Sequence, residues 1–338
     1  PSERNGLDLD LFSDAAIRDP HPLYRAIREH APAVWLPAHR VWALGRYADV
    51  RAALRADAIL VSGRGVALND FLNDQPGVTT LTSDGEAHRR RRGVIMKPML
   101  PRALAEVRNR IEQMADELVA GLIGREGFDG IADFARHLPI AMVSHLVGLP
   151  EEGRERMLDW AAAAFDTLGP MNARAQAAGP DIMGMIQYAV GLDPARLRPD
   201  GWAARIFQAA DAGTLEEDEA RGLLVDYIAP SLDTTILATG HMLHLLGMHP
   251  DQYAFLRADP ARIPAAVNEA LRVGSPVRAF TRLAVAPYEA GDVAIPEGER
   301  VLILYGSANH DERHYPDPDR FVVTREARDH LAFGFGVH

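Results

Sequence analysis

The feature that most constrains the fold is a long apolar helical pattern between Thr214 and His249. Thr214, followed three residues later by Glu217, is typical of a capping box, and Pro250 ends the pattern. About 35 residues at about 1.5 Å each span roughly 50 Å. The apolar side chains lie on more than one face of this helix: Leu223, Leu224, Tyr227, Ile228, Leu232, Ile236 and Leu237. We expect such a helix to run through the middle of the protein.

The rest of the chain is predicted to be mostly helical, with a small β region toward its end. Gly169-Pro170 and Gly179-Pro180 are expected to separate the central helices. The predicted elements are helices over residues 22–30, 47–56, 87–99, 104–122, 131–147, 154–168, 180–192 and 264–273, strands over 34–44, 277–286, 292–295 and 300–304, and a loop over 63–77.

Composition excludes several classes of protein. The 338 residues are 47% hydrophobic and 25% charged, which is typical of a globular protein, and we expect a single domain over residues 1–338. The net charge of -11 argues against a nucleic-acid partner. We find no run of about 18 apolar residues, so no membrane-spanning helix is expected. The absence of cysteine excludes disulfides and thiolate ligands within these residues and favours a cytoplasmic protein.

The middle of the long helix contains residues that disfavour a helix. Pro230 removes one backbone hydrogen bond and clashes with the carbonyl group of Asp226, so we expect a kink or an opening. Asp233-Thr234-Thr235 follows directly. One interpretation is a kinked core helix whose threonine hydroxyls bond to the preceding turn. The other is a distorted groove in which a carboxylate and a hydroxyl deliver protons to a buried site.

Two other helices present polar pairs on one face. Glu269 and Arg272 are spaced i, i+3, which usually indicates a surface salt bridge, and a buried version would need a third partner. His88 and Arg92 are spaced i, i+4 within a run of basic residues. That run indicates either a solvated basic face or two donors suited to a buried carboxylate ligand.

The C-terminal segment offers a further signal. In Phe333-Gly334-Phe335-Gly336-Val337-His338, glycines bracket an aromatic residue, as in a tight turn where the backbone approaches something flat or bulky. His310 and His314 have the spacing of helical metal ligands, but the prolines and polar residues around them favour a loop. We therefore expect no metal site formed by these two histidines.

The order and spacing of these motifs resemble the cytochrome P450 family over nearly the whole chain. Ala229–Thr235 looks like the oxygen-groove motif of the family's central helix, and Glu269–Arg272 looks like its Glu-x-x-Arg pair. Asn309–Phe321 resembles the meander that supplies the pair's third partner, which the resemblance assigns to Arg320. Phe333–His338 looks like the start of the haem-binding loop Phe-Gly-x-Gly-x-His-x-Cys.

The resemblance implies a P450 fold, haem b as cofactor, and a role for each motif residue. Asp233 and Thr234 would relay protons to iron-bound dioxygen. The ligands of the haem propionates would be His88, Arg92, Arg282 and His338, with Phe333 and Gly336 beside the thiolate side of the haem. Glu269, Arg272 and Arg320 would be structural.

The sequence departs from the family pattern at two places. Pro230-Ser231 replaces the usual Ala/Gly-Gly before the acid-alcohol pair, so we expect a wider or differently hydrated groove. The iron-ligand cysteine is expected about two positions beyond His338, so the sequence itself contains no metal ligand and lacks the C-terminal part of the fold.

The resemblance implies a haem-thiolate monooxygenase that takes electrons from a ferredoxin or a reductase. The alternatives are a haem- or ligand-binding module of the same fold without catalysis, or a P450 acting on terpenes, fatty acids or other natural products. Residues 64–71 and 275–282 resemble the P450 branch that oxidises small methoxylated aromatics. By position in that branch, the substrate-binding residues would be Leu68, Phe165, Leu168, Ala229, Phe280 and Thr281. Arg64 or Arg278 would be the partner of a substrate carboxylate.

Overall fold

The computed structural model describes residues 6–75 and 77–338, which divide into two compact units. The first unit consists of residues 1–75, 168–171 and 241–338, and the second of 76–167 and 172–240. The chain therefore passes between the units four times. The expectation of one domain over residues 1–338 remains a prediction. In the part of the chain that the structure describes, no helix is both long enough and apolar enough to span a membrane.

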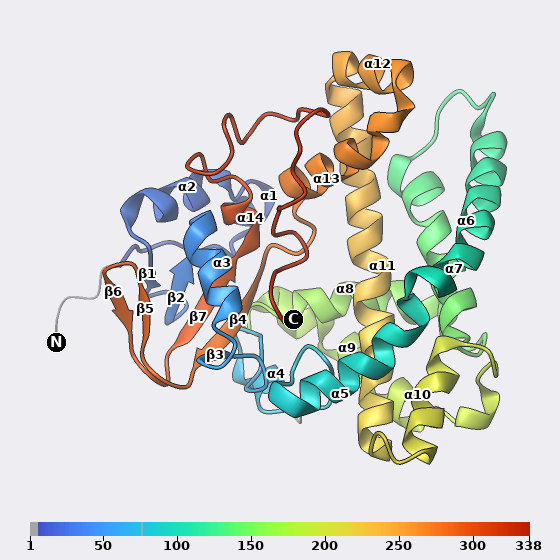
Figure 1. Ribbon diagram of the computed structural model, residues 1–338, viewed down its shortest axis with the longest axis horizontal. Helices are drawn as coiled ribbons and strands as arrows, with labels where there is room; N and C mark the ends of the chain where they lie inside the picture. Colours follow the sequence, from blue (N-terminus) through green and yellow to red (C-terminus); the bar gives the residue numbers. More distant parts are fainter. Residues whose placement is uncertain (1–5, 76) are drawn as a thin grey trace. The chain divides into compact units, whose positions relative to one another are not determined.

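The first unit is built on a five-stranded sheet with the strand order β1-β2-β7-β4-β3, and a separate two-stranded sheet is formed by β5 and β6 (Figure 1). Strand β2 pairs in parallel with β7, while the other neighbours are antiparallel. The strands are β1 (Val34–Leu36), β2 (Val41–Leu44), β3 (Leu60–Val61), β4 (Ala279–Ala284), β5 (Tyr288–Ala290), β6 (Val293–Ile295) and β7 (Arg300–Leu304).

Short helices surround this sheet. Buried apolar residues of α2, α3 and the strands form its core, which includes Ile27, Val50 and Ile303. The helices of the first unit are α1 (Asp14–Arg18), α2 (His21–His30), α3 (Tyr47–Arg55), α4 (Asp70–Asn73), α12 (Pro250–Ala258), α13 (Ile263–Gly274) and α14 (Tyr305–Ala308).

The second unit is helical throughout the residues that the structure describes. Its core gathers buried side chains such as Trp160, Met185 and Tyr227. Its helices are α5 (Gly85–Met96), α6 (Pro101–Leu122), α7 (His137–Val147), α8 (Met157–Asp166), α9 (Ala173–Gly191), α10 (Trp202–Asp211) and α11 (Glu217–Met248), the last of which continues into the first unit (Figure 1). The prediction of a mostly α fold with a small β region is confirmed.

Three predicted boundaries are wrong. The strand expected over residues 34–44 is a hairpin of β1 and β2, because the chain turns at Arg40, where φ is +50°. Helix α9 begins seven residues before Pro180 and continues through it, since burial of Ile182 and Met185 outweighs the one lost hydrogen bond. Helix α11 begins at Glu217, and its cap is the Glu219 carboxylate, which accepts from the backbone N–H of Glu216 at 2.9 Å.

Candidate functional site

The first unit contains a fully buried ion pair on α13. The Nε of Arg272 lies 2.7 Å from Oε2 of Glu269, and both side chains have no exposed surface. Arg272 also donates to the backbone carbonyls of Asn309 and Pro318, each at 2.7 Å. A buried guanidinium is tolerated only when its donors are satisfied in this way. The i, i+3 spacing thus produces a structural centre rather than a surface pair.

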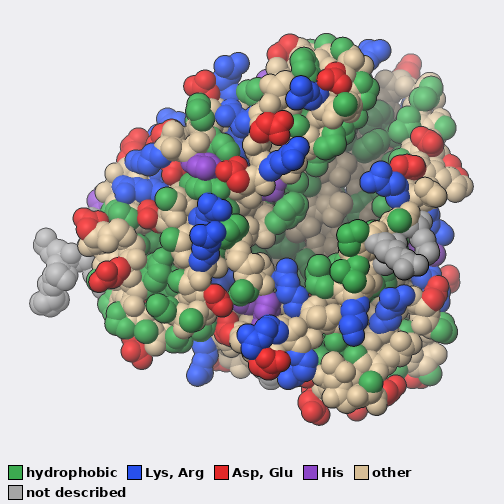
Figure 2. Space-filling model, in the orientation of Figure 1, with side chains coloured by type: hydrophobic (Ala, Val, Ile, Leu, Met, Phe, Trp, Pro, Cys, Tyr) green, Lys and Arg blue, Asp and Glu red, His purple; other side chains and the backbone are tan. Residues whose placement is uncertain are grey.

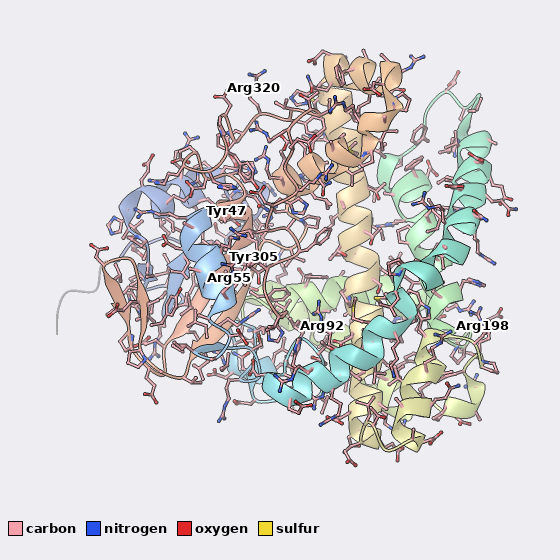
Figure 3. The ribbon with its side chains drawn as sticks, viewed as in Figure 1. Tyr47, Arg55, Arg92, Arg198, Tyr305 and Arg320 are labelled. Carbon is pink, nitrogen blue, oxygen red and sulfur yellow. The ribbon has the colours of Figure 1, made fainter. Side chains whose placement is uncertain are left out.

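The third partner of this pair is Arg325, which corrects the prediction of Arg320. The Nε of Arg325 donates to Oε1 of Glu269 at 3.0 Å, and the backbone N–H of Val322 donates to the same oxygen at 3.1 Å. Arg320 contributes its carbonyl oxygen, 3.2 Å from Nη2 of Arg272, while its side chain is exposed and points away from the protein (Figure 3). Asp317, with a φ of +47°, lies in a turn in which the backbone N–H of Arg320 donates to the carbonyl of Asp317 at 3.1 Å.

Arg282 on β4 is a buried cation in the first unit. Its side chain is 4% exposed, and its Nη1 donates to the carbonyl of Thr281 at 2.8 Å. Over residues 6–75 and 77–338, no carboxylate forms an ion pair with it. Tyr305, also buried, has its pKa raised by burial, an effect that a hydrogen bond with Arg282 offsets in part. A buried guanidinium without a carboxylate partner suits an anionic ligand.

The same strand corrects one predicted substrate contact. Neighbouring residues of a strand face opposite sides, so Phe280 and Thr281 cannot line one pocket. Thr281 is 1% exposed and donates its hydroxyl hydrogen to the carbonyl of Ala67 at 2.8 Å. It therefore holds the 66–67 loop to the sheet and is not available to a substrate. Phe280 is half-buried, and its ring lies 6.2 Å from that of Tyr305.

The C-terminal turn has the backbone that the sequence pattern predicts. Gly334 and Gly336 have φ values of +71° and +89°. A Cβ at Gly336 would lie 2.5 Å from the carbonyl oxygen of Leu54, so only glycine fits there. Between them, the Phe335 ring lies under the guanidinium of Arg51 at 4.5 Å. Phe333 is 75% exposed, and His338 is the last residue of the turn.

In the second unit, His88 and Arg92 lie on α5, where His88 is buried and Arg92 half-buried. Figure 3 labels Arg92 on this helix. Sequence reasoning missed their neighbour Arg91, which is buried and donates through Nε and Nη2 to Oε1 of Glu219 at 3.0 and 2.8 Å. Arg90 bonds to the same oxygen. Part of the basic run therefore anchors α5 to the first turn of α11, which a run of consecutive arginines could not reveal by itself.

The hydrogen bonds in the middle of α11 follow the first interpretation, in which the threonine hydroxyls bond to the preceding turn, and the proton-delivering groove remains a prediction. The Thr234 hydroxyl donates to the carbonyl of Pro230 at 2.6 Å, as expected for a threonine bonded to the preceding turn. Asp233 is half-buried, and no basic side chain described here forms an ion pair with it. Burial raises its pKa, and the charge of Asp166 raises it further, while Arg136 opposes both. The pair is thus a hydroxyl and a neighbouring carboxyl group whose pKa is raised.

Asp226, which lies one turn before Pro230 on α11, also has a raised pKa. The Oδ2 of Asp226 accepts from the backbone N–H of Thr80 at 2.7 Å. Burial raises the pKa of Asp226 from the usual 3.8 to about 6, and the bond from Thr80 together with the charge of Arg91 offsets only part of the effect. Nothing in the sequence pattern distinguishes this acid from an exposed one.

The remaining predicted substrate residues are divided between the units. In the first unit, Leu68 and Leu168 are half-buried and adjacent, since the N–H of Leu68 donates to the carbonyl of Leu168 at 2.9 Å. In the second unit, Phe165 near the end of α8 and Ala229 on α11 are half-buried. Of the two arginines considered for a substrate carboxylate, Arg278 donates to the carbonyl of Ile17 at 2.7 Å, and Arg64 is exposed.

Comparison with known proteins identifies the family. The sequence model of the family "Cytochrome P450" matches residues 263–338. Cytochrome P450 CYP199A2 of Rhodopseudomonas palustris is 36% identical over 337 residues, covering 98% of this chain and 82% of that protein. Cytochrome P450 107B1 of Saccharopolyspora erythraea is 35% identical over 355 residues, with coverages of 98% and 85%. The crystal structure of CalO2 superposes with a TM-score of 0.84 at 28% identity, with coverages of 97% and 85%. This chain therefore belongs to the cytochrome P450 family.

Members of this family are monooxygenases that use haem b with a cysteine thiolate as iron ligand. Two observations in the first unit fit this group. Arg282 is a buried cation without a carboxylate partner, as a haem propionate requires, and the turn at Gly336 admits no side chain. Bound haem supplies the activation of dioxygen, and the protein supplies orientation and protons.

Proposed function

We propose that this protein inserts one oxygen atom of dioxygen into a small methoxylated aromatic, by O-demethylation or hydroxylation. The observation that carries the monooxygenase part is the arrangement on α11, where the Thr234 hydroxyl bonds to the Pro230 carbonyl beside a carboxyl group of raised pKa. In this proposal Asp233 would take a proton from solvent and pass it to the Thr234 hydroxyl, which would supply protons for the dioxygen chemistry of bound haem. His88, Arg92, Arg282 and His338 hold the haem propionates.

Thr234→Ala tests the relay. The variant is expected to bind haem and substrate as the native protein does, but to release reducing equivalents as peroxide, because alanine cannot pass on a proton. The measurement is product formed per electron consumed, with hydrogen peroxide assayed in parallel. Thr239→Ala is a matched control, since this hydroxyl makes the same i−4 bond, to Thr235 at 2.8 Å, two turns from Asp233. If the coupling were unchanged in Thr234→Ala, the proton relay would have to run through Ser231 or water instead.

The aromatic substrate is supported by the residues assigned to it and by the two segments that resemble the aromatic-oxidising branch. Phe280 and Phe165 are half-buried aromatic rings, and each buried aromatic contact contributes about 0.5–1.5 kcal/mol beyond the buried area. Leu68, Leu168 and Ala229 add apolar surface without charge. We therefore propose that these residues bind a flat ring in the haem-loaded protein.

Titration of the haem Soret band with guaiacol and with 4-methoxybenzoate tests this assignment. At least one of the two ligands is expected to shift the band, and Phe280→Ala is expected to weaken the binding of that ligand by about tenfold. Arg64→Ala is expected to weaken only the benzoate if Arg64 pairs with its carboxylate. A shift by a terpene or fatty acid, with none by either aromatic, would reject the aromatic substrate and leave the monooxygenase class intact.

For electron supply, we propose a ferredoxin or a reductase. Arg51 and Arg55 stack on Phe335 in the C-terminal turn, at 4.5 and 4.8 Å, and place two cations where an acidic partner could bind (Figure 3). On the face shown in Figure 2, basic and acidic side chains are otherwise interspersed. Arg55→Glu is expected to reduce turnover supported by ferredoxin at low salt and to leave turnover supported by hydrogen peroxide unchanged. Equal loss in both assays would contradict this docking role.

A further inference from the structure

Three side chains of the kinds that bind transition metals converge in the first unit, apart from the residues assigned to haem or substrate. His21 begins α2, and His310 and Asp319 lie in the segment after α14. One ligand atom from each lies within 4.8 Å of the other two. His310 is buried, whereas His21 and Asp319 are exposed, so the cluster is accessible from solvent on one side. The His21 and His310 ring centroids are 4.3 Å apart.

The hydrogen bonds of His310 show which of its two ring nitrogens can act as a metal ligand. Its Nε2 lies 3.0 Å from the carbonyl oxygen of Val273, which can only accept, so Nε2 carries a hydrogen. Its Nδ1 lies 2.9 Å from Oδ1 of Asp319. In a neutral ring this contact brings together two acceptors, so either a second ring proton or a metal cation accounts for it. A histidine that binds a metal commonly donates its other ring N–H to a backbone carbonyl, as His310 does.

The carboxylate of Asp319 is likewise oriented by a hydrogen bond to its second oxygen. Its Oδ2 accepts from Nη2 of Arg25 at 3.0 Å, which orients the carboxylate and leaves Oδ1 directed at His310. Ligating carboxylates are commonly hydrogen-bonded at their second oxygen. The charges of Arg25 and Arg278 oppose a bound cation, and those of Asp19 and Asp319 favour it. Three protein ligands leave a fourth position for water.

We propose that His21, His310 and Asp319 bind a divalent transition-metal ion, for which Zn²⁺ is the appropriate probe. Two imidazoles and a carboxylate suit Zn²⁺ rather than Mg²⁺ or Ca²⁺, which prefer oxygen ligands. The exposed His21 ring closes on the ion by rotation. The bound ion ties α2 to the segment after α14 and, through Val273, to the end of α13, which carries Arg272. Its role is structural stabilisation of this region.

Isothermal titration of ZnCl₂ into the full-length, haem-loaded protein tests the site, with thermal unfolding as a second readout. We expect one site whose affinity falls at least tenfold in His21→Ala and in Asp319→Asn. Zinc is expected to raise the unfolding temperature of the native protein and not that of His21→Ala. His30→Ala is the matched control, because His30 is exposed and ends the same helix. It is expected to bind zinc like the native protein.

His21 is exposed, so its replacement leaves the fold intact and keeps the test decisive. Anomalous diffraction at the zinc absorption edge then locates the ion. An ion located between His21, His310 and Asp319 supports the proposal. Equal affinity in His21→Ala, an anomalous peak at other residues, or no binding at millimolar zinc would overturn it. In those cases His310 is a doubly protonated ring paired with Asp319 only.

Discussion

The carboxylates of Glu269 and Asp233 are both withdrawn from solvent, yet their surroundings differ in every respect. Glu269 accepts four hydrogen bonds, from Arg272 (two), Arg325 and the backbone of Val322. Asp233 has no ion-pair partner among the described residues, and its pKa is raised by burial and by Asp166. The saturated carboxylate can only hold structure, whereas the unsaturated one can exchange a proton. In the proposed mechanism, environment rather than residue type separates the structural acid Glu269 from the proton-relaying acid Asp233.

The largest expected effect comes from breaking the saturated centre. Arg272→Ala leaves Glu269 buried without its principal cation and frees the carbonyls of Asn309 and Pro318. Removing one partner of a buried pair destabilises by about 3–5 kcal/mol, so we expect little soluble, haem-replete protein. Haem content per protein and urea unfolding measure this. A variant that is soluble, fully loaded with haem and as stable as the native protein would contradict the structural role of the pair.

A smaller effect distinguishes Arg325 from Arg320 as the third partner of the Glu269–Arg272 pair. Arg325→Ala removes a charge-assisted bond to Glu269 and is expected to cost about 1.5–3 kcal/mol. Arg320→Ala retains the carbonyl that Arg272 uses and is expected to change stability by less than about 0.5 kcal/mol. The free energy of unfolding of both variants decides between them. If the larger loss followed Arg320→Ala, the third partner would be Arg320 after all.

A further stability effect concerns Asp226, and its size depends on pH. Because the folded-state pKa of about 6 lies above the usual 3.8, the protonated carboxyl leaves folding undisturbed below pH 4. Its ionisation destabilises the fold progressively as the pH rises from about 4 to about 6, and the penalty stays constant above that range.

Asp226→Asn is expected to remove this dependence. The difference between 3.8 and about 6 corresponds to about 3 kcal/mol at full burial, and partial exposure reduces the expected gain at pH 8 to about 1–2 kcal/mol. The variant and the native protein should have equal stability at pH 4. Unfolding temperatures measured at pH 4, 6 and 8 check this. A constant difference across that range would show that ionisation of Asp226 is not the cause.

What the sequence predicted well was local. The i, i+3 spacing of Glu269 and Arg272, the threonine after Pro230 and the glycines of the C-terminal turn each act within a few residues, where helix and turn geometry fixes the outcome. The choice of Arg325 over Arg320 depends on the turn at Asp317, which side-chain chemistry does not encode. Thr281 was assigned to the pocket although strand alternation already placed it opposite Phe280.

Other errors came from runs of similar residues. In the run from Arg89 to Arg92, successive side chains turn by about 100° around the helix, so the buried one is decided by what packs against α5. Likewise Asp226 reads as an ordinary acid of a long helix, because burial is a property of the packed unit. The pairing of Glu219 with Arg91 could be inferred only once the two helices were in place.

The discontinuity of the first unit has a consequence for synthesis. Strand β2, made early, must wait for its parallel neighbour β7 from the far end of the sequence, and closing so long a loop is slow. The Glu269–Arg272 pair likewise lacks its further partners until Asn309, Pro318 and Arg325 have left the ribosome. The second unit is complete by residue 240. During translation the two units therefore mature in the reverse of their order of appearance, and a chain interrupted before β7 would leave β2 without its parallel neighbour and exposed to aggregation.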